Sequence, residues 1–435
     1  MRFILIPSLI LALLHWYIWR RLVRDTQLAT GARHVATLAL TLLALSIPLT
    51  FVTWWTISRS ASPALSRLAL GWLGLIMYLL GFLMAGDLLR VAIRLRRRPR
   101  ATAVDSCAAP ALSSEPNMRT AVQVAACAPT AINTDASASR LVGVEPASRL
   151  GRETRRVFVA RVAAGSALAV AGGIGAFGVR SAFWDITTPE VPIALSRFPR
   201  ALDGYTIALL SDIHIGPLLD GRFLRHVVEQ TNRTRPDLIA IVGDLVDGRV
   251  REIGAQVAEL RGLRARDGVC FVTGNHEYYS GGLVWVDFLR KLGLRVLMNE
   301  RVALGDASAR GARFDLAGVP DHRAFASSGI GPDAHAATFG RDPERELVML
   351  AHQPIQIAQT SRVGMGLQLS GHTHGGQMFP FGAVAAMLAQ PYLAGLYRHT
   401  PGGSQIYVSR GTGFWGPPMR VFAPAEISVI RLHST

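Results

Sequence analysis

From residue 205 onward, short apolar runs alternate with longer segments of mixed polarity. The runs are four to six residues long and rich in Val, Ile and Leu. Such runs predict buried core strands, and the apolar spacing of the segments between or beside them predicts helices. The predicted strands are Tyr205–Leu210, Leu238–Val242, Val269–Thr273, Leu347–Ala351 and Leu367–Ser370, and the predicted helices are Phe223–Arg233, Ile253–Leu263 and Leu283–Leu292. Residues 201–435 are therefore expected to form an α/β domain.

The first 180 residues have a different pattern, with four stretches that contain no Asp, Glu, Lys or Arg. Each is long enough, or nearly so, to cross the hydrocarbon of a bilayer. The stretches are Phe3–Trp19, Val35–Ser58, Leu68–Gly86 and Val162–Val179. We expect three transmembrane helices within residues 1–98 and a fourth within 155–180. The alternative for each stretch is a helix buried in a protein core.

Composition and charge agree with a chain that lies partly in a membrane. It is 50% hydrophobic and only 17% charged, which is unusual for a wholly soluble protein. The formal net charge is +16, but residues 1–180 carry 21 basic and 7 acidic side chains, whereas residues 181–435 carry 25 and 23. The excess positive charge thus belongs to the membrane half, so no nucleic-acid partner is expected. The three cysteines give no disulfide framework.

The distribution of arginine predicts how the helices are oriented. Arginines are concentrated in the loop after the first predicted helix and after the third, and such loops stay in the cytoplasm. Between them, the loop after the second helix holds only Arg59 and Arg67, which fits the outer face. The N-terminus is then also outside. Residues 99–154, dominated by Ala, Ser, Thr and Pro, are expected to be a disordered cytoplasmic linker.

The segment Thr154–Arg161 contains Arg155 and Arg156 before a mild apolar run, and it resembles a bacterial twin-arginine export signal. The alternative is an ordinary cytoplasmic flank of a transmembrane helix. Both interpretations place the C-terminal domain on the extracytoplasmic side of a bacterial cytoplasmic membrane.

Each of the five predicted strands runs into a polar cluster at its C-terminal end. The clusters are Ser211–His214, Gly243–Asp247, Gly274–Glu277, His352 and Gly371–His374. Ligands of open α/β sheets bind at the carboxyl edge, so five clusters in the same sense can converge on one site. Asp, Asn and His without thiolate suit Mn, Fe, Zn or a similar divalent ion. A single cluster is weak, because Gly-Asp turns and lone histidines are common, but burying all five without metal would be costly.

The ordered pattern Asp-x-His, Gly-Asp-x-x-Asp, Gly-Asn-His-Asp/Glu, His and Gly-His-x-His resembles that of the calcineurin-like metallophosphoesterase family. The resemblance covers roughly residues 201–432. Gly371–Gln377 and Gly411–Pro418 make the chain most similar to the bacterial membrane-associated or exported branch. It implies a four-layer α/β/β/α sandwich, whereas the strand pattern alone gives a single sheet.

The resemblance also implies the ligands of two divalent metal ions, with Mn, Fe and Zn the expected candidates. One ion would be held by Asp212, His214 and His374, the other by Asn275, His352 and His372, and Asp244 would bridge both. A carboxylate has two oxygens to share between two cations, which supports the bridging role. A hydroxide between the ions is then expected to attack phosphorus in line with the leaving oxygen.

Two further residues are expected to be catalytic. His276 would stabilise developing charge or protonate the leaving group, and by the same resemblance Asp247 would hold the ring of His276 in orientation. Alternatively, Asp247 caps the following helix. A solvated helix start is the preferred interpretation of Glu277, with a supporting hydrogen-bond acceptor as the alternative. The loop of Phe414, Trp415 and Arg420 could hold substrate or pack into the core, so substrate-binding residues are left open. His15 and His34 are expected at the membrane interface.

Three functions compete at this point. The preferred one is hydrolysis of a phosphodiester or phosphomonoester, with a lipid- or envelope-linked substrate favoured by the anchor. The second is a cytosolic-face pyrophosphate hydrolase acting on a lipid precursor such as UDP-2,3-diacylglucosamine. The third is a membrane scaffold with an inactive phosphoesterase domain, which predicts missing ligands.

Overall fold

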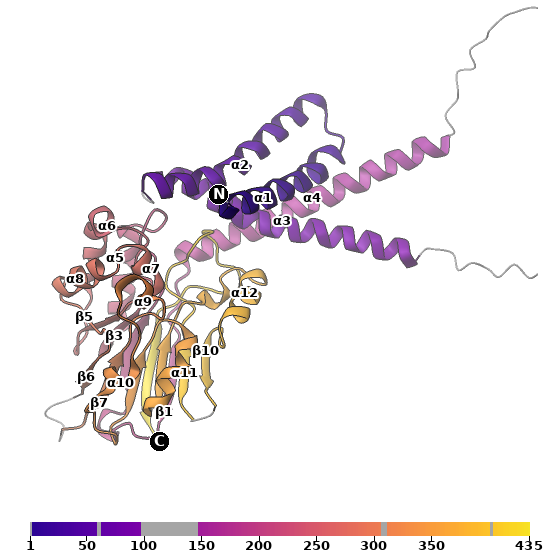
Figure 1. Cartoon of the computed structure of the whole chain (residues 1–435). Coiled ribbons are helices and arrows are strands. Elements are labelled where there is room, and N and C mark those ends of the chain that lie inside the picture. Colours follow the sequence, from indigo (N-terminus) through magenta and orange to yellow (C-terminus); the bar gives the residue numbers. More distant parts are fainter. Residues whose placement is uncertain (1, 59–61, 97–146, 306–310, 401–402) are drawn as a thin grey trace, which may run out of the picture.

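The computed structural model describes residues 2–58, 62–96, 147–305, 311–400 and 403–435. Four long helices lie together at one end of an α/β sandwich, and the C-terminus lies at the other end (Figure 1). They are α1 (Arg2–Trp19), α2 (Thr30–Thr56), α3 (Pro63–Arg96) and α4 (Ala147–Trp184), with a π-helical turn at Arg20–Arg24. In α2, in Pro63–Ile93 of α3 and in Thr154–Trp184 of α4, the helix is long and apolar enough to cross a membrane. The first predicted span coincides with α1, and its crossing stays a prediction.

Most of the predicted linker lies outside the described residues, which resume at Ala147. Residues 147–154 belong to α4 instead of to a linker. Extending an existing helix costs less free energy than nucleating a new one. The helix-favouring residues Ala, Arg, Leu and Glu of this segment therefore extend α4 in the N-terminal direction.

Two six-stranded mixed sheets form the centre of the sandwich. The first has the order β1-β12-β2-β3-β4-β5 and the second β10-β11-β9-β8-β7-β6. The strands of the first are β1 (Glu190–Leu195), β2 (Tyr205–Leu210), β3 (Leu238–Val242), β4 (Val269–Val272), β5 (Arg295–Val296) and β12 (Ser428–Ser434). Those of the second are β6 (Glu300–Leu304), β7 (Phe314–Gly318), β8 (Leu347–Leu350), β9 (Leu367–Ser370), β10 (Gly395–Arg398) and β11 (Gln405–Val408). Strands β2 to β5 pair in parallel, as do β7, β8, β9 and β11.

Alternate residues of the central strands belong to different cores. Ala208 and Leu210 of β2 pack outward with Leu224 and Trp285, in the layer of α5 (Gly221–Arg233), α6 (Val250–Val257) and α8 (Leu283–Lys291). Ile207 and Leu209 face the second sheet, in a core shared with β7, β8 and β9. The far face of the second sheet packs on α10 (Ala334–Thr338) and α11 (Ile357–Thr360). Short helices α7 (Asn275–Tyr279), α9 (Ala324–Ser328) and α12 (Phe381–Ala389) complete the fold.

The four-layer α/β/β/α architecture expected from the resemblance is therefore confirmed, and the single sheet given by the strand pattern is wrong. The five predicted strands were placed correctly along the chain, but three belong to one sheet and two to the other. A strand buried on both faces has the same apolar run in either sheet.

The helices at the end of the sandwich share a core with it. Met378, Met419 and Val421 of the sandwich pack among Ile47, Leu79 and other buried residues of the helices. Within this bundle lies His15, which was expected at the membrane interface. It is buried, and its Nε2 accepts a hydrogen bond of 2.9 Å from Trp72 Nε1. A buried indole N–H needs an acceptor, and the imidazole supplies it.

Candidate metal centre

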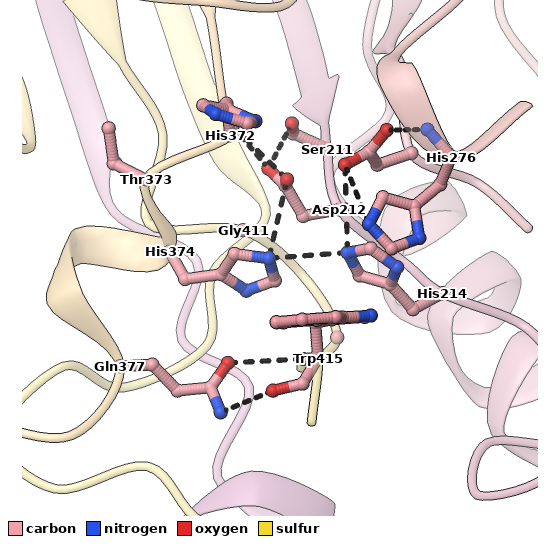
Figure 2. Close-up of polar contacts among 12 residues, drawn as sticks. Ser211, Asp212, His214, His276, His372, Thr373, His374, Gln377, Gly411 and Trp415 are labelled. Atoms are coloured by element: carbon pink, nitrogen blue, oxygen red, sulfur yellow. Dashed lines mark hydrogen bonds and ion pairs between the residues drawn. The ribbon is translucent and has the colours of Figure 1, made fainter. Parts of the chain in front are cut away.

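The five polar clusters meet at one place, where the carboxyl ends of strands from both sheets come together. Three clusters follow β2, β3 and β4 of the first sheet, and two follow β8 and β9 of the second. Figure 2 shows Asp212, His214, His276, His372 and His374 facing one another. Side chains that are up to 162 positions apart, from Asp212 to His374, thus line a common volume.

The backbone is strained at this edge. The described chain has ten non-glycine residues with positive φ, and five of them are predicted metal ligands. These are Asp212 (53°), His214 (55°), Asp244 (52°), His372 (70°) and His374 (52°). Left-handed conformations of non-glycine residues are held only where the surrounding structure imposes them, and they concentrate at functional sites.

The first group of possible ligands consists of Asp212, His214 and His374. The Nε2 atoms of the two imidazoles are 3.2 Å apart, and His374 Nε2 lies 3.5 Å from Asp212 Oδ1. Burial lowers the pKa of His374 to about 3. An imidazole that is neutral keeps a ring lone pair for a cation, so this group fits a metal ion.

The second group consists of Asp244, His352 and His372. Asp244 Oδ2 lies 3.1 Å from His352 Nε2, and His372 Nδ1 lies 3.3 Å from the same nitrogen. In the loop that meets Asp244 through the backbone N–H of His276, Asn275 Oδ1 is buried and has no hydrogen-bond partner among the described residues. A buried amide oxygen without a partner is rare, because each one carries a desolvation penalty of about 1–3 kcal/mol. A cation at this position would satisfy it.

Asp244 joins the two groups through a single oxygen. Its Oδ2 is 3.1 Å from His352 Nε2 and 3.9 Å from His214 Nε2, one ring from each group. Its Oδ1 accepts the backbone N–H of His276 at 2.8 Å. The sequence argument assigned one oxygen to each ion, but the geometry directs the same oxygen to both groups.

Asp247 contacts two imidazoles. Its Oδ1 lies 2.5 Å from His276 Nδ1, and its Oδ2 lies 3.1 Å from His214 Nδ1. The helix that it might have capped begins later, after Arg249. Burial opposes ionisation of Asp247, yet the two rings hold its pKa well below the usual range. The contact between Asp247 and His214 was not predicted, because the two residues are 33 positions apart and no local sequence pattern indicates that they meet.

His276 is buried and forms a third group with His214 and Asp247. Its ring contacts those of Tyr279 and Trp415 edge to face, with centroid distances of 5.3 and 5.5 Å. Burial alone would lower the pKa of His276, but the carboxylates of Asp244 and Asp247 outweigh it and raise that pKa to about 9. His276 therefore carries a proton at neutral pH and can donate it.

Glu277 is not at a solvated helix start, and that preferred interpretation is wrong. The side chain is fully buried, and its carboxylate accepts the backbone N–H groups of Gly274 (2.6 Å), Leu245 (2.8 Å) and Asp244 (3.0 Å). It thereby fixes the loops after β3 and β4 against each other. Burial and the nearby Asp244 raise the pKa of Glu277 to about 7.

A fifth carboxylate, Asp321, was missed by the sequence reasoning. It follows β7, is fully buried, and its Oδ2 accepts a hydrogen bond of 2.9 Å from Gln353 Nε2, beside His352. The signal was the same as for the other clusters, a polar residue after a strand. It was overlooked because β7 contains Asp315 and does not form an uninterrupted apolar run.

The loop after β11 divides between packing and the site. Phe414 is buried against Phe183, and Arg420 is fully buried, with its guanidinium donating to the backbone carbonyls of Gly413, Ala423 and Arg410. Arg420 thus holds loops together and is not turned toward a substrate. Trp415 is 53% exposed and covers His276, with its backbone bonded to the side chain of Gln377 (Figure 2).

Residues of the N-terminal helices also reach the centre. A pocket of about 30 Å³ beside His214 and Asp247 is closed by Trp54 of α2 and Leu70 of α3, together with Trp415. This is room for roughly one water molecule. The mouth of the centre therefore lies where the sandwich meets the helices.

Comparison with known proteins agrees with this geometry. Residues 205–376 match the family model for calcineurin-like phosphoesterases. An uncharacterised metallophosphoesterase of Bacillus subtilis is 32% identical over 58% of this chain and 86% of its own length. The chain belongs to the calcineurin-like metallophosphoesterase family. Membership accounts for the four-layer sandwich and for the position of the polar clusters at its strand ends.

Other members of the family match more closely over a smaller share of their length. A metallophosphoesterase of Helicobacter pylori is 41% identical over 56% of this chain and 63% of its own. A cattle protein named as a transmembrane protein with a metallophosphoesterase domain is 40% identical over 57% of each chain. The chain thus spans about three fifths of the length of these relatives. Its helices and the cattle protein's name together support association with a membrane.

Proposed function

We propose that the protein is a membrane-anchored phosphoesterase that holds two divalent metal ions, of which Mn, Fe and Zn are the candidates. The observation that carries the proposal is the meeting of two His/Asp groups at Asp244 Oδ2, together with the buried Asn275 Oδ1, which has no hydrogen-bond partner among the described residues. Asp212, His214 and His374 would hold one ion. Asn275, His352 and His372 would hold the other, and Asp244 would bind both.

Two such cations would supply an activated water as nucleophile and offset charge on the phosphoryl oxygens. The chain itself prepares the ligands for this. His352 Nδ1 lies 2.7 Å from Val242 O and donates its proton there, which leaves Nε2 free on the metal side. His214 is held in the same way by Asp247. Such partners fix the tautomer and the orientation of a ligating ring.

His276 is the proposed general acid. Its Nδ1 is held by Asp247, and its Nε2 lies 4.0 Å from Asp244 Oδ2, so Nε2 faces the centre and can transfer its proton to the leaving oxygen of an ester bound there. A pKa of about 9 keeps this proton on the ring at neutral pH until the leaving oxygen gains charge. Glu277 supports the transfer indirectly, because it fixes the backbone that carries Asp244 and the loop before His276.

The arrangement of basic residues supports an extracytoplasmic catalytic domain. Arg161 Nε donates to Thr26 O at 3.0 Å, and Arg90 bonds Val159 O at 3.4 Å. These contacts join the turn after α1, the part of α3 around Arg90 and the part of α4 around Val159–Arg161, before α3 and α4 diverge toward their ends away from the sandwich (Figure 1). Because arginine-rich ends stay in the cytoplasm, the sandwich would face the outside of a bacterial cytoplasmic membrane.

The position of the mouth supports a lipid-linked substrate. Trp54 and Leu70 belong to helices proposed to cross the bilayer, and they line the pocket beside His214. Tryptophan is enriched at the level of lipid headgroups. A phosphate ester attached to a lipid would therefore arrive at the centre without leaving the membrane surface. The same arginine pattern opposes a cytosolic pyrophosphate hydrolase, and the completeness of the proposed ligand set opposes an inactive scaffold.

The test uses the full chain in lipid nanodiscs. Metal is removed with a chelator, and Mn, Fe, Zn, Mg or Ca is added back separately. Hydrolysis of bis-p-nitrophenyl phosphate and p-nitrophenyl phosphate is measured, together with bound metal per chain. We expect two ions per chain, turnover that depends on them, and loss of turnover in Asp244→Asn. The ratio of the two rates gives the preferred ester class.

Asp287→Asn is the matched control, because Asp287 lies exposed on α8. It should bind metal and turn over as the wild type does. Two bound ions without turnover of either ester would restrict the proposal to a narrow natural substrate. Failure of the wild type to bind metal would overturn it and favour the scaffold.

A further inference from the structure

The α12 segment, here residues Met378–Ala389, exposes an apolar surface beside the transmembrane helices. Val384 (56%), Met387 (66%) and Leu388 (85%) lie at i, i+3 and i+4 on the open face of α12, and Phe379 and Phe422 extend this surface. No Asp, Glu, Lys or Arg occurs between His374 and Arg398. Contiguous exposed apolar surface of this kind marks a contact with another phase or molecule.

The segment packs on the part of α3 that is proposed to lie in hydrocarbon. Phe381 contacts Tyr78 edge to face at 5.6 Å, and its ring is 3.1 Å from where a Cβ on Gly81 would stand. Both belong to the charge-free stretch Leu68–Gly86. Gly81 is 13 residues from Leu68, roughly 20 Å along the helix axis. The α12 segment therefore lies beside the interior of the span, well away from its outer end.

The backbone of the segment is suited to an environment without water. Inside a bilayer every peptide N–H and C=O must be satisfied by the protein. Phe379 O accepts the Tyr78 hydroxyl at 2.9 Å, and Phe379 N donates to Val421 O at 3.2 Å. Pro380 has no N–H, and the helical bonds of α12 begin with Gly382 N to Met378 O at 2.9 Å.

Loops on the other side of the segment are anchored in the same region. Arg420 N donates to Gly178 O of α4 at 2.8 Å, and Met419 fills the space next to Gly74 and Gly178. Phe177 of α4 and Phe422 have ring centroids 6.2 Å apart. The catalytic domain is thus in contact with both α3 and α4 within their charge-free stretches.

We propose that the α12 segment, together with Phe422, inserts into the hydrocarbon of the bilayer, with Val384, Met387, Leu388, Phe379 and Phe422 in contact with lipid chains. The partner is the hydrocarbon itself, because the apolar surface is continuous with that of α3 and α4. The inference rests on the membrane crossing of these helices and is independent of metal chemistry. Its consequence is that the catalytic domain is seated in the membrane and not merely tethered to it.

The test measures quenching of a fluorophore by lipids that carry a spin label in the acyl chain. The full chain, with Cys107→Ser and Cys127→Ser, receives a single labelled cysteine as Leu388→Cys or Met387→Cys in nanodiscs. Cys270 is buried in β4 and stays unlabelled. Leu45→Cys on the exposed face of α2 is the hydrocarbon control. Phe339→Cys is the matched aqueous control, since Phe339 is 90% exposed on the far part of the sandwich.

We expect quenching at 387 and 388 close to that at 45 and at least threefold stronger than at 339. Quenching at both positions no stronger than at 339, with strong quenching at 45, would overturn the insertion while leaving the anchor intact. Disulfide formation between two unlabelled Leu388→Cys chains, with no quenching of the labelled form, would assign the surface to a second copy instead. Weak quenching at 45 as well would overturn the membrane crossing and the insertion together, whatever the metal assays show.

Discussion

Replacing Asp247 by Asn separates the two tasks that its carboxylate performs. Asparagine has nearly the same shape but no charge, and only one of its two polar atoms accepts a hydrogen bond. It cannot accept from both His276 Nδ1 and His214 Nδ1, which now lie 2.5 and 3.1 Å from different oxygens. We therefore expect defects in proton transfer through His276 and in metal binding through His214.

The expected magnitudes differ for the two tasks. Loss of an orienting partner of a metal-ligating ring lowers metal affinity by roughly 10- to 100-fold. Loss of general-acid assistance lowers turnover by roughly 10²- to 10⁴-fold for an ester with a poor leaving group. An ester of p-nitrophenol, whose leaving group needs no proton, should lose much less. The contrast between the two esters isolates the role of His276.

The dependence of turnover on pH gives an independent test of the role of His276. A general acid acts while protonated, so wild-type turnover should fall as the pH rises through the pKa of His276, about 9. Removing the charge of Asp247 removes one of the carboxylate charges that raise this pKa. The fall in turnover should therefore move to lower pH in Asp247→Asn.

The assay compares turnover on an alkyl and a p-nitrophenyl phosphodiester at saturating metal, from pH 6 to 10. Asp267→Asn is the matched control, because the Asp267 side chain is 17% exposed against 13% for Asp247 and also accepts a hydrogen bond from a ring-bearing side chain. An equal loss on both esters at saturating metal, with an unchanged pH profile, would refute the assignment of His276 as the acid.

Three further changes test other parts of the centre. Asn275→Ala should reduce bound metal from two ions to one per chain, as measured by metal analysis. The free energy of unfolding of the metal-free protein, measured by thermal denaturation, should change by less than about 1 kcal/mol, because Oδ1 has no hydrogen-bond partner among the described residues. Gly371→Ala should destabilise the protein by about 1–3 kcal/mol and abolish metal binding, because the added Cβ would lie 1.7 Å from Ser211 Oγ. Gly172→Ala is the neutral control, because a Cβ added at Gly172 would meet no atom of the described residues within 4 Å. Trp54→Ala should raise KM for a lipid-linked ester in nanodiscs and leave kinetics on a soluble ester within twofold; an equal change for both would remove Trp54 from the substrate path.

The seating of the catalytic domain affects how these measurements are done. Met419 packs between α3 and α4, and Phe381 packs on α3, so the sandwich and the helices share buried surface. Removing the helices would expose that surface and the mouth at Trp54. The full chain in a bilayer is therefore the appropriate form for kinetics.

The sequence by itself determined the local structure and most of the chemistry. Strands β2, β3 and β9 begin and end where the predicted runs do, because strands buried on both faces are rich in Val, Ile and Leu. The five clusters were found because each polar residue directly follows its strand. The helices α1 to α4 were predicted correctly because a long stretch without charged residues can be identified without knowing what it packs against.

Only the tertiary structure decided which elements face one another. The two sheets could not be separated, since apolar runs report that a strand is buried and not what covers it. Glu277 was misjudged because its three backbone donors come from two loops, and Asp321 was missed because β7 carries a buried charge. Trp54, Leu70 and the α12 segment gained a role only from contacts across 144 or more positions, such as Leu70 with His214 in one pocket. Local sequence patterns indicate which residues are buried and which elements are helices or strands. A site between distant segments depends on how these elements pack, and no short stretch of sequence predicts that packing.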